Sequence, residues 1–387
     1  MFPRSVYLHV PFCTRRCAYC DFAVQATPAA PVADWLEAVR REVRLLAEEQ
    51  AWPTLELDTI YLGGGTPSLL GCGAMAGVAE GLGEVAEWDA GGVEWTCEAN
   101  PESFTRELAR DWRAAGVNRL SLGAQSFQEQ VLRWMGRMHG SEGPARAMGA
   151  AREAGFDNIS VDLIFGVPSR LDRDWRADLE GALALDPEHI SLYGLTAEAA
   201  TPLGRWVREG REVLADEDRY AEEYLLAHEM LTAAGFEHYE VSNFSRPGLR
   251  SRHNFAYWTG APYAAVGPGS HAFYPPLRRW NLRDWPAYRD ALADGRLPIE
   301  GEETVSGEDA ALESVWLGLR TDLGYRLDDA PDLQRELAGL WAARGLASID
   351  GETVRLTAEG WLLLDRLAVD FAAAGELIRS AGNRGSD

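Results

Sequence analysis

The sequence has no apolar stretch long enough to span a membrane as a helix. It also has no recognisable signal peptide, because the apolar segment near the N-terminus ends at Pro11 and runs directly into a group of cysteines. We therefore expect a cytoplasmic protein that does not insert directly into a membrane.

Basic residues are in deficit: Lys and Arg together number 37, against 60 Asp and Glu, and the formal net charge is -23 at pH 7. An excess of negative charge this large repels phosphate backbones and anionic lipid surfaces. The composition therefore argues against nucleic acid as a partner and favours a small molecule or another protein.

Cysteine is also scarce, since the chain has five in 387 residues, and their placement does not suggest a disulfide framework. Cys13, Cys17 and Cys20 fall within eight residues of one another, which favours a metal site in a reducing compartment. Cys72 and Cys97 stand far apart, and we expect them to be structural.

Short apolar runs alternate with helical patterns over most of the chain, and 46% hydrophobic content is enough for a sizeable core. Runs this short are typical of strands buried on both faces of a parallel sheet. The expected strands are Val6 to Val10, Thr59 to Leu62, Val93 to Cys97, Arg119 to Leu122, Ile159 to Ile164 and His189 to Leu192. The expected helices are Val32 to Glu49, Thr105 to Ala115, Gly143 to Ala154, Arg173 to Ala184 and Asp216 to Ala234. Successive βα units of this kind curl into a barrel or part-barrel that binds ligands at the carboxyl ends of its strands.

The pattern changes after about residue 298. We expect helices over Asp309 to Arg320 and Leu333 to Ala343, a hairpin at Asp350-Gly351, a last helix from Thr357 through Phe371, and a frayed tail over Ser380 to Asp387. This is the outline of a small winged-helix-like α+β domain. We therefore predict an α/β protein with a partial barrel over residues 1–235, a linking segment over 236–300 and a C-terminal cap over 301–380.

The cysteines form a C-x3-C-x2-C group directly after the first expected strand. Thiolates are the usual ligands of iron–sulfur clusters, and three of them would leave the fourth iron of a cubane open. An open coordination position suits a metal that binds a ligand or takes part in catalysis. The spacing alone leaves two alternatives: a zinc site completed by His9, or three unrelated cysteines.

With Tyr19 just before the third cysteine, the loop resembles the signature of the radical S-adenosylmethionine (SAM) superfamily. That resemblance implies a (β/α)6 partial barrel and a [4Fe–4S] cluster on Cys13, Cys17 and Cys20. It also implies that the open iron chelates SAM and that one electron cleaves SAM to a 5′-deoxyadenosyl radical.

A second motif, Gly63-Gly64-Gly65-Thr66-Pro67, ends the second expected strand. Consecutive glycines let a backbone approach a ligand closely. The segment is not a phosphate-binding P-loop, because no Gly-Lys-Ser/Thr follows it. It resembles the superfamily segment that contacts the SAM ammonium group.

Within the superfamily, the chain resembles the oxygen-independent coproporphyrinogen III oxidases and their relatives. The resemblance implies SAM contacts from Tyr7, Tyr19, Gly64, Gly65, Thr66, Glu98, Gln125, Arg137 and Asp162. Alternatives remain: Tyr19 could be a packing aromatic, and each carboxylate or Arg137 could belong to an ordinary buried ion pair.

Three features separate the oxidases from the related HemW-type haem chaperones. Phe22 stands where the oxidases have a fourth cysteine. The oxidases also carry an N-terminal extension before the cluster, whereas only twelve residues precede Cys13 here. The run His253-Asn254-Phe255-Ala256-Tyr257-Trp258 resembles the His-Asn-x-x-Tyr-Trp motif of the chaperones. Histidine is a good axial ligand of haem iron, and aromatic rings offer flat surface to a porphyrin. The haem-binding candidates are His253, Tyr257, Trp258 and His271. Among the histidines, His271 has lower weight than His253, and His9 is a third candidate that lies next to the cluster and could serve there instead. The same motif could instead tie a loop to the barrel.

The resemblance predicts a haem-binding chaperone that transfers haem, as cargo, to soluble or membrane-bound acceptor haemoproteins and carries the cluster and SAM. The alternative is an enzyme, a radical SAM oxidative decarboxylase of coproporphyrinogen III. Both interpretations require the cluster and SAM, so the sequence leaves open whether the chain is an enzyme.

Overall fold

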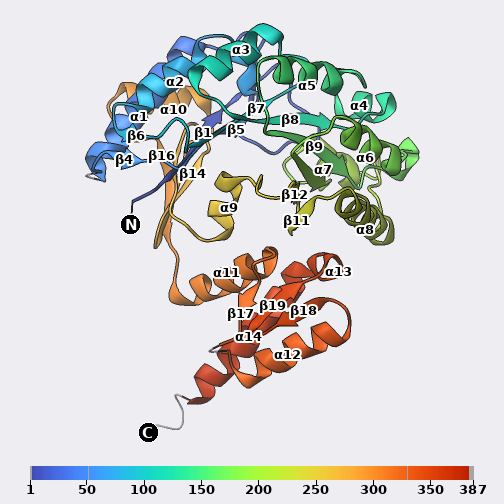
Figure 1. The fold of residues 1–387 in the computed structure, drawn as a ribbon. Helices are drawn as coiled ribbons and strands as arrows, with labels where there is room; N and C mark the ends of the chain where they lie inside the picture. Colours follow the sequence, from blue (N-terminus) through green and yellow to red (C-terminus); the bar gives the residue numbers. More distant parts are fainter. Residues whose placement is uncertain (1, 51, 329, 383–387) are drawn as a thin grey trace.

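The structure is a computed structural model that describes residues 2–50, 52–328 and 330–382. Figure 1 shows a curved sheet with helices on its outer side and, below it, a smaller group of helices and strands at the C-terminal end. The layout is that of the predicted α/β partial barrel with a small additional α+β domain.

The sheet has nine strands in the order β11-β12-β10-β9-β8-β7-β5-β1-β13. All six strands expected from the sequence are present and parallel to one another: β1 (Ser5–Val10), β5 (Thr59–Gly64), β7 (Glu94–Ala99), β8 (Arg119–Gln125), β9 (Ile159–Phe165) and β10 (His189–Gly194). Because these six strands are parallel, their carboxyl ends meet at one edge of the barrel, where ligands bind in such folds.

Three further strands come from residues 236–300, the expected linking segment. β13 (Ala264–Val266) is parallel to β1 at one edge of the sheet. At the other edge, β12 (Asn243–Ser245) pairs antiparallel with β10, and β11 (Glu237–Glu240) pairs antiparallel with β12. The segment therefore pairs with both edge strands of the expected barrel. The limits at residues 235 and 300 stay a prediction.

Most of the connections between these strands contain a helix. The helices are α1 (Val32–Glu49), α2 (Ala74–Leu82), α3 (Arg106–Ala115), α4 (Glu129–Met135), α5 (Gly143–Glu153), α6 (Trp175–Ala184), α7 (Pro202–Arg208) and α8 (Glu217–Ala233), with short 3-10 turns η1 (Pro67–Leu69) and η2 (Ser169–Leu171). Thr105 and Asp216 cap α3 and α8 by accepting a backbone N–H at the third position. Gly116, Gly155 and Gly235 have φ of +110°, +87° and +86°, which is why the helix-to-strand junctions carry glycine there.

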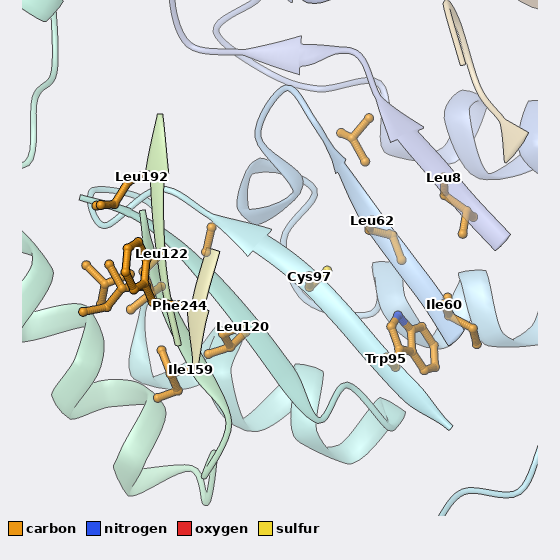
Figure 2. Packing of buried hydrophobic residues seen from close by; sticks show 14 of the residues in the cluster. Leu8, Ile60, Leu62, Trp95, Cys97, Leu120, Leu122, Ile159, Leu192 and Phe244 are labelled. Atoms are coloured by element: carbon orange, nitrogen blue, oxygen red, sulfur yellow. The ribbon is translucent and has the colours of Figure 1, made fainter. Parts of the chain in front are cut away.

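The main core fills the space between the sheet and these helices. Figure 2 shows side chains such as Leu8, Leu62 and Leu120 packed around the strands. Cys97 is also fully buried there, with its Sγ 3.5 Å from Met75 Sδ, whereas Cys72 is exposed. Neither cysteine takes part in a disulfide.

The rest of residues 236–306 forms a second small sheet and two helices beside the barrel. Its elements are α9 (Arg252–Trp258), β14 (His271–Tyr274), β15 (Leu277–Asn281), α10 (Trp285–Ala293) and β16 (Ile299–Thr304), and the three strands form one antiparallel sheet. Two pairs of very short strands, β2 (Phe12–Cys13) with β3 (Gln25–Ala26) and β4 (Leu55–Glu56) with β6 (Ala86–Glu87), complete the barrel part.

The C-terminal domain contains the expected helices and hairpin, with one further strand. Its elements are α11 (Gly307–Arg320), β17 (Tyr325–Arg326), α12 (Asp332–Ala343), β18 (Ala347–Asp350), β19 (Thr353–Leu356), α13 (Ala358–Trp361) and α14 (Leu364–Gly382). The last helix was expected as one piece ending at Phe371; it is split after Trp361, and its second part continues to Gly382. Residues 383–387 of the expected frayed tail lie outside the described residues. Among the described residues, no helix is both long and apolar enough to cross a membrane.

Candidate functional site

A single cavity of about 970 Å³ opens at the carboxyl ends of the barrel strands. This volume is at the upper end of the range of about 300–1,000 Å³ typical of small-molecule sites. One side, the strand-end wall, consists of Tyr7, Gly64, Glu98, Ser121, Gln125, Asp162, Ile164 and Tyr193. A second part of the lining, the 257–283 wall, consists of Tyr257, Trp258, Tyr263, Gly269, Ser270, His271 and Arg283. The cysteine loop, residues 13–24, lines the cavity as well.

The predicted cluster and SAM residues come together in this cavity. Cys13, Cys17 and Cys20 line it, and so do all nine predicted SAM contacts: Tyr7, Tyr19, Gly64, Gly65, Thr66, Glu98, Gln125, Arg137 and Asp162. Of the predicted haem contacts, Tyr257, Trp258 and His271 line it, and His253 does not. Residues as far apart in the sequence as Tyr7 and His271 therefore share one space.

Backbone hydrogen bonds hold the cysteine loop at several points. Cys13 lies in β2, which pairs with β3, and the N–H of Leu203 at the start of α7 donates to the carbonyl of Ala18 at 2.9 Å. The guanidinium of Arg283 donates to the carbonyl of Asp21 at 2.7 Å. The loop is therefore anchored to the barrel and to the 257–283 wall while its thiols face the cavity.

The donor arrangement can be tested against a cluster and against zinc. The three cysteines are partly buried, form no disulfide, and lie at one cavity. Yet within the described ranges no three His, Cys, Asp or Glu side chains surround a point where a single metal ion could sit. His9, the expected fourth zinc ligand, has both ring nitrogens engaged, by the Tyr7 hydroxyl at 3.0 Å and the Ala23 carbonyl at 2.9 Å. The donors fit a cubane, whose thiolates each bind a different iron, better than they fit zinc.

The thiols themselves need a positive partner. Burial raises the pKa of Cys13 to about 11 and also raises the pKa of Cys20. A bound metal deprotonates a coordinating thiol outright because its charge reverses this preference. When bound, a cluster would supply one-electron redox chemistry and an open iron at this place.

A chain of hydrogen bonds links Cys13 to Arg137, and all of its members line the cavity. The hydroxyl of Thr66 donates to Cys13 Sγ at 3.4 Å and accepts from Asn100 Nδ2 at 3.2 Å. The Asn100 oxygen accepts from the guanidinium of Arg137 at 3.1 Å, and Arg137 also donates to the Gly123 carbonyl at 3.0 Å. Thr66 and Arg137 are thus held in fixed positions, and Arg137 has no carboxylate partner within the described residues.

Gly64 and Gly65 of the second motif are needed for close contacts within the protein. A Cβ on Gly64, whose φ is +100°, would lie 2.2 Å from the ring of His9. A Cβ on Gly65 would lie 2.6 Å from the carbonyl oxygen of Val10. The sequence interpretation attributed these glycines to close approach of a ligand, and the structure adds that β1 and His9 already occupy the space of any side chain.

The carboxylates of the strand-end wall are buried. Glu98 accepts from the Tyr61 hydroxyl at 2.9 Å and from the Gly64 N–H at 3.0 Å, and burial raises its pKa to about 7. Asp162 accepts from the hydroxyl of Ser121, and burial raises its pKa as well. Neither has an ion-pair partner among the described residues, so a ligand ammonium or hydroxyl would compensate their burial. This geometry does not support the ordinary ion-pair alternative for these two carboxylates.

Four polar atoms of cavity-lining residues are buried without a hydrogen-bond partner among the described residues: Glu102 Oε2, Gln125 Oε1, Arg137 Nε and Trp258 Nε1. Buried polar groups are normally satisfied, so these orphans at a cavity indicate a polar ligand. Gln125 also has a φ of +68°, unusual for a residue other than glycine, at an irregularity in the pairing of β8 with β9. Strain of this kind persists where the surroundings enforce it, most often at binding sites.

His253 lies behind the cavity wall. It is 1% exposed, its Nδ1 is 2.7 Å from the Thr59 hydroxyl, and its Nε2 is 2.7 Å from the Tyr257 hydroxyl. Its ring stacks on Tyr61 at 5.0 Å between centroids. With both nitrogens engaged, neither is free to bind iron, so the geometry favours the alternative in which the motif ties α9 to the barrel.

Trp258, the last residue of the motif, connects the cavity to the C-terminal domain. The guanidinium of Arg320 from α11 lies 4.0 Å from the centre of its ring, and Arg320 also pairs with the buried Glu240 at 2.9 Å. The His-Asn-x-x-Tyr-Trp motif is therefore a bridge: His253 contacts the barrel, Tyr257 faces the cavity, and Trp258 contacts the cap.

Several cavity residues were not predicted from the sequence, including Tyr193, Tyr263 and Arg283. Tyr193 directly follows the expected strand ending at Leu192, so the strand-end rule could have found it. Tyr263 and Arg283 carry no such signal, because only the pairing of β13 with β1 and of β14 with β15 brings them to the cavity.

Comparisons with known proteins agree with the fold. Residues 7–181 match the Radical SAM superfamily. The solved structure of coproporphyrinogen III oxidase (HemN) from Escherichia coli superposes with a TM-score of 0.80 over 96% of this chain and 90% of that one, at 20% sequence identity. The radical S-adenosyl methionine domain-containing protein 1, mitochondrial, of Bos taurus is 33% identical over 93% of this chain and 82% of its own length. The chain is therefore a radical SAM protein, and membership of this superfamily implies a [4Fe–4S] cluster and SAM.

Relatives with higher sequence identity show which family within the superfamily the chain belongs to. The heme chaperone HemW of Mycobacterium tuberculosis is 40% identical over 94% of this chain and 93% of its own length. The heme chaperone HemW of Bacillus subtilis is 33% identical over 93% of this chain and 97% of its own length. The chain belongs to the HemW family.

Proposed function

We propose that this chain is a haem chaperone of the cytoplasm: it binds haem as cargo and passes it to acceptor haemoproteins. It holds a [4Fe–4S] cluster on Cys13, Cys17 and Cys20 and SAM on the strand-end wall. The observation that carries this proposal is that one cavity joins the three free thiols, the orphaned polar atoms and an aromatic wall. Similarity to HemW proteins over nearly the whole length supports haem as the cargo.

The experiment is a haem titration followed by transfer. Anaerobically reconstituted full-length protein should bind haemin with a saturable change in the Soret band. The loaded protein should then give haem to haem-free cytochromes in membranes of a haem-deficient bacterium, seen as their returning absorption bands. A chain that binds no haemin would refute the proposal, and one that never releases it would be a haem store and not a chaperone.

The competing function is oxidative decarboxylation of coproporphyrinogen III. The likeness to HemN at 20% identity supports the shared fold alone. Incubation of the reconstituted protein with SAM, a reductant and coproporphyrinogen III tests the enzyme directly. We expect no protoporphyrinogen, and its appearance would overturn the chaperone assignment.

Thr66 provides a test of the cluster site that does not depend on haem. Thr66→Val keeps the shape of the side chain but removes the hydroxyl that donates to Cys13 Sγ. Hydrogen bonds to cluster sulfurs raise the reduction potential because they stabilise the more negative reduced state. We expect full iron content and a more negative potential in an anaerobic redox titration. An unchanged potential would show that this hydroxyl does not face a cluster ligand.

A further inference from the structure

The histidines differ sharply in what their ring nitrogens do. All seven lie within the described residues, and His271 is the one whose side chain is exposed. Only His9 and His271 line the cavity, and both nitrogens of His9 are already hydrogen-bonded. The ring of His271 makes no side-chain hydrogen bond to any described residue. It is therefore the one imidazole in the cavity with nitrogens free to bind iron.

The position of His271 is fixed although its nitrogens are free. His271 pairs with Trp280 across β14 and β15, and their rings stack at 5.9 Å between centroids and 20° between planes. The turn before it is also held: the Gly267 N–H donates to the buried carboxylate of Glu42 at 2.8 Å. A ligand held in place before binding loses little freedom when the metal arrives.

An arginine without a carboxylate partner lies close to this histidine. Arg283 lines the cavity, and no Asp or Glu of the described residues lies within 4.0 Å of its guanidinium, which contacts only the carbonyl of Asp21. The Gly269 N–H, two residues before His271, donates to the carbonyl of Leu282 at 3.0 Å, which places Arg283 beside that turn. In a chain of net charge -23, a free guanidinium in a cavity indicates an anionic ligand.

Aromatic side chains at the cavity supply flat apolar surface. Phe22 and Tyr193 are 60% and 46% exposed, and both line the cavity together with Tyr257, Trp258 and Tyr263. Exposed aromatics at a cavity mark a site for a large apolar ligand.

We propose that haem lies against the 257–283 wall with His271 as an axial ligand of its iron and Arg283 paired with one of its propionates. This inference rests on the proposed haem chaperone function and names the part of the cavity that performs it. His253, which the motif resemblance suggested as the ligand, is instead a positioning residue that holds Tyr257 through the hydrogen bond between Nε2 and the hydroxyl.

Two porphyrins separate iron ligation from propionate recognition. Full-length protein is titrated with haemin and, separately, with metal-free protoporphyrin IX, following the Soret band and the quenching of tryptophan fluorescence. His271→Ala should weaken haemin binding by roughly tenfold or more, equivalent to about 1.4 kcal/mol. It should leave protoporphyrin affinity unchanged, and added imidazole should restore the spectrum of the histidine-bound haem.

Arg283→Ala should weaken the binding of both porphyrins, because both carry propionates. His228→Ala, on α8 away from the cavity, and Arg110→Ala, at an exposed arginine of α3, are the matched controls and should bind as the original chain does. A His253→Gln variant should keep the haem spectrum, since the proposal does not use that ring as an iron ligand.

The outcomes distinguish a failure of the proposed haem site from a failure of the proposed chaperone function. If the original chain binds no haemin, the haem chaperone proposal itself fails. If the original chain binds haemin and His271→Ala binds it equally well with the same spectrum, the haem site proposed here is wrong and the chaperone function stands. If His253→Gln loses the haem spectrum and His271→Ala keeps it, the axial ligand of the iron is His253 and not His271.

Discussion

Replacing Cys17 with alanine should abolish the cluster and leave the fold intact. One iron of a cubane would lose its protein ligand, and the remaining two thiolates are too few to hold the cluster. Cys17 is partly exposed on a loop at the cavity and lies outside both hydrophobic core clusters. After anaerobic reconstitution, we expect iron and sulfide content and the visible absorbance of the cluster to fall to the background level.

The stability comparison must use the cluster-free form of both proteins, because a bound ligand stabilises the state that binds it. In that form, Cys17→Ala should unfold within a few degrees of the original chain, about the shift expected for 1 kcal/mol or less. Cys72→Ala removes an exposed cysteine elsewhere and should keep the whole cluster. A variant that keeps its iron, or one that fails to fold, would contradict this assignment of the loop.

The barrel could be predicted from the sequence because its signals are local. Each of the six short apolar runs is a strand, and each expected helix of the barrel lies within two residues of its predicted limits. The junction glycines report a left-handed backbone directly. Such patterns depend on neighbours a few residues apart, which a single sequence displays.

The edges of the sheet could not be predicted, since long-range pairing decides them. β13 has three residues, and nothing in Ala264–Val266 indicates that it lies beside β1, more than 250 residues earlier. The same reason explains why the sequence missed Arg283 and favoured His253. A histidine in a recognised motif resembles a ligand, and only the contacts with Thr59 and Tyr257 show that its nitrogens are occupied.

A buried carboxylate behind the 257–283 wall gives the second large effect, a dependence of stability on pH. Glu42 of α1 is 1% exposed and accepts hydrogen bonds from the Gly267 N–H, the Asn281 amide and the Tyr288 hydroxyl. No cation pairs with it among the described residues, and burial raises its pKa from 4.5 to about 7. Its three donors come from the turn before His271, from β15 and from α10, so this side chain links three elements at and behind the wall to α1.

The sign of the effect follows from that raised pKa. Below the unfolded value of 4.5 the group is protonated in both states and its contribution to stability is fully present. As the pH rises from 4.5, the unfolded chain ionises while the folded group keeps its proton, so this contribution of roughly 3 kcal/mol decreases and is lost once the pH has risen through about 7.

The side chain introduced by Glu42→Gln cannot ionise. We therefore compare the two proteins by subtracting the unfolding free energy of the variant from that of the original chain. This difference should fall by roughly 3 kcal/mol between pH 4.5 and pH 8. Urea unfolding of both proteins at a series of pH values measures this difference. The subtraction cancels the contributions of all other titrating groups, because both proteins share them. Glu107→Gln, at an exposed glutamate of α3, should change the unfolding free energy by less than about 0.5 kcal/mol throughout. A difference for Glu42→Gln that does not vary with pH would mean that its carboxylate is already compensated, and that the hydrogen bonds from Gly267, Asn281 and Tyr288 suffice to keep it ionised.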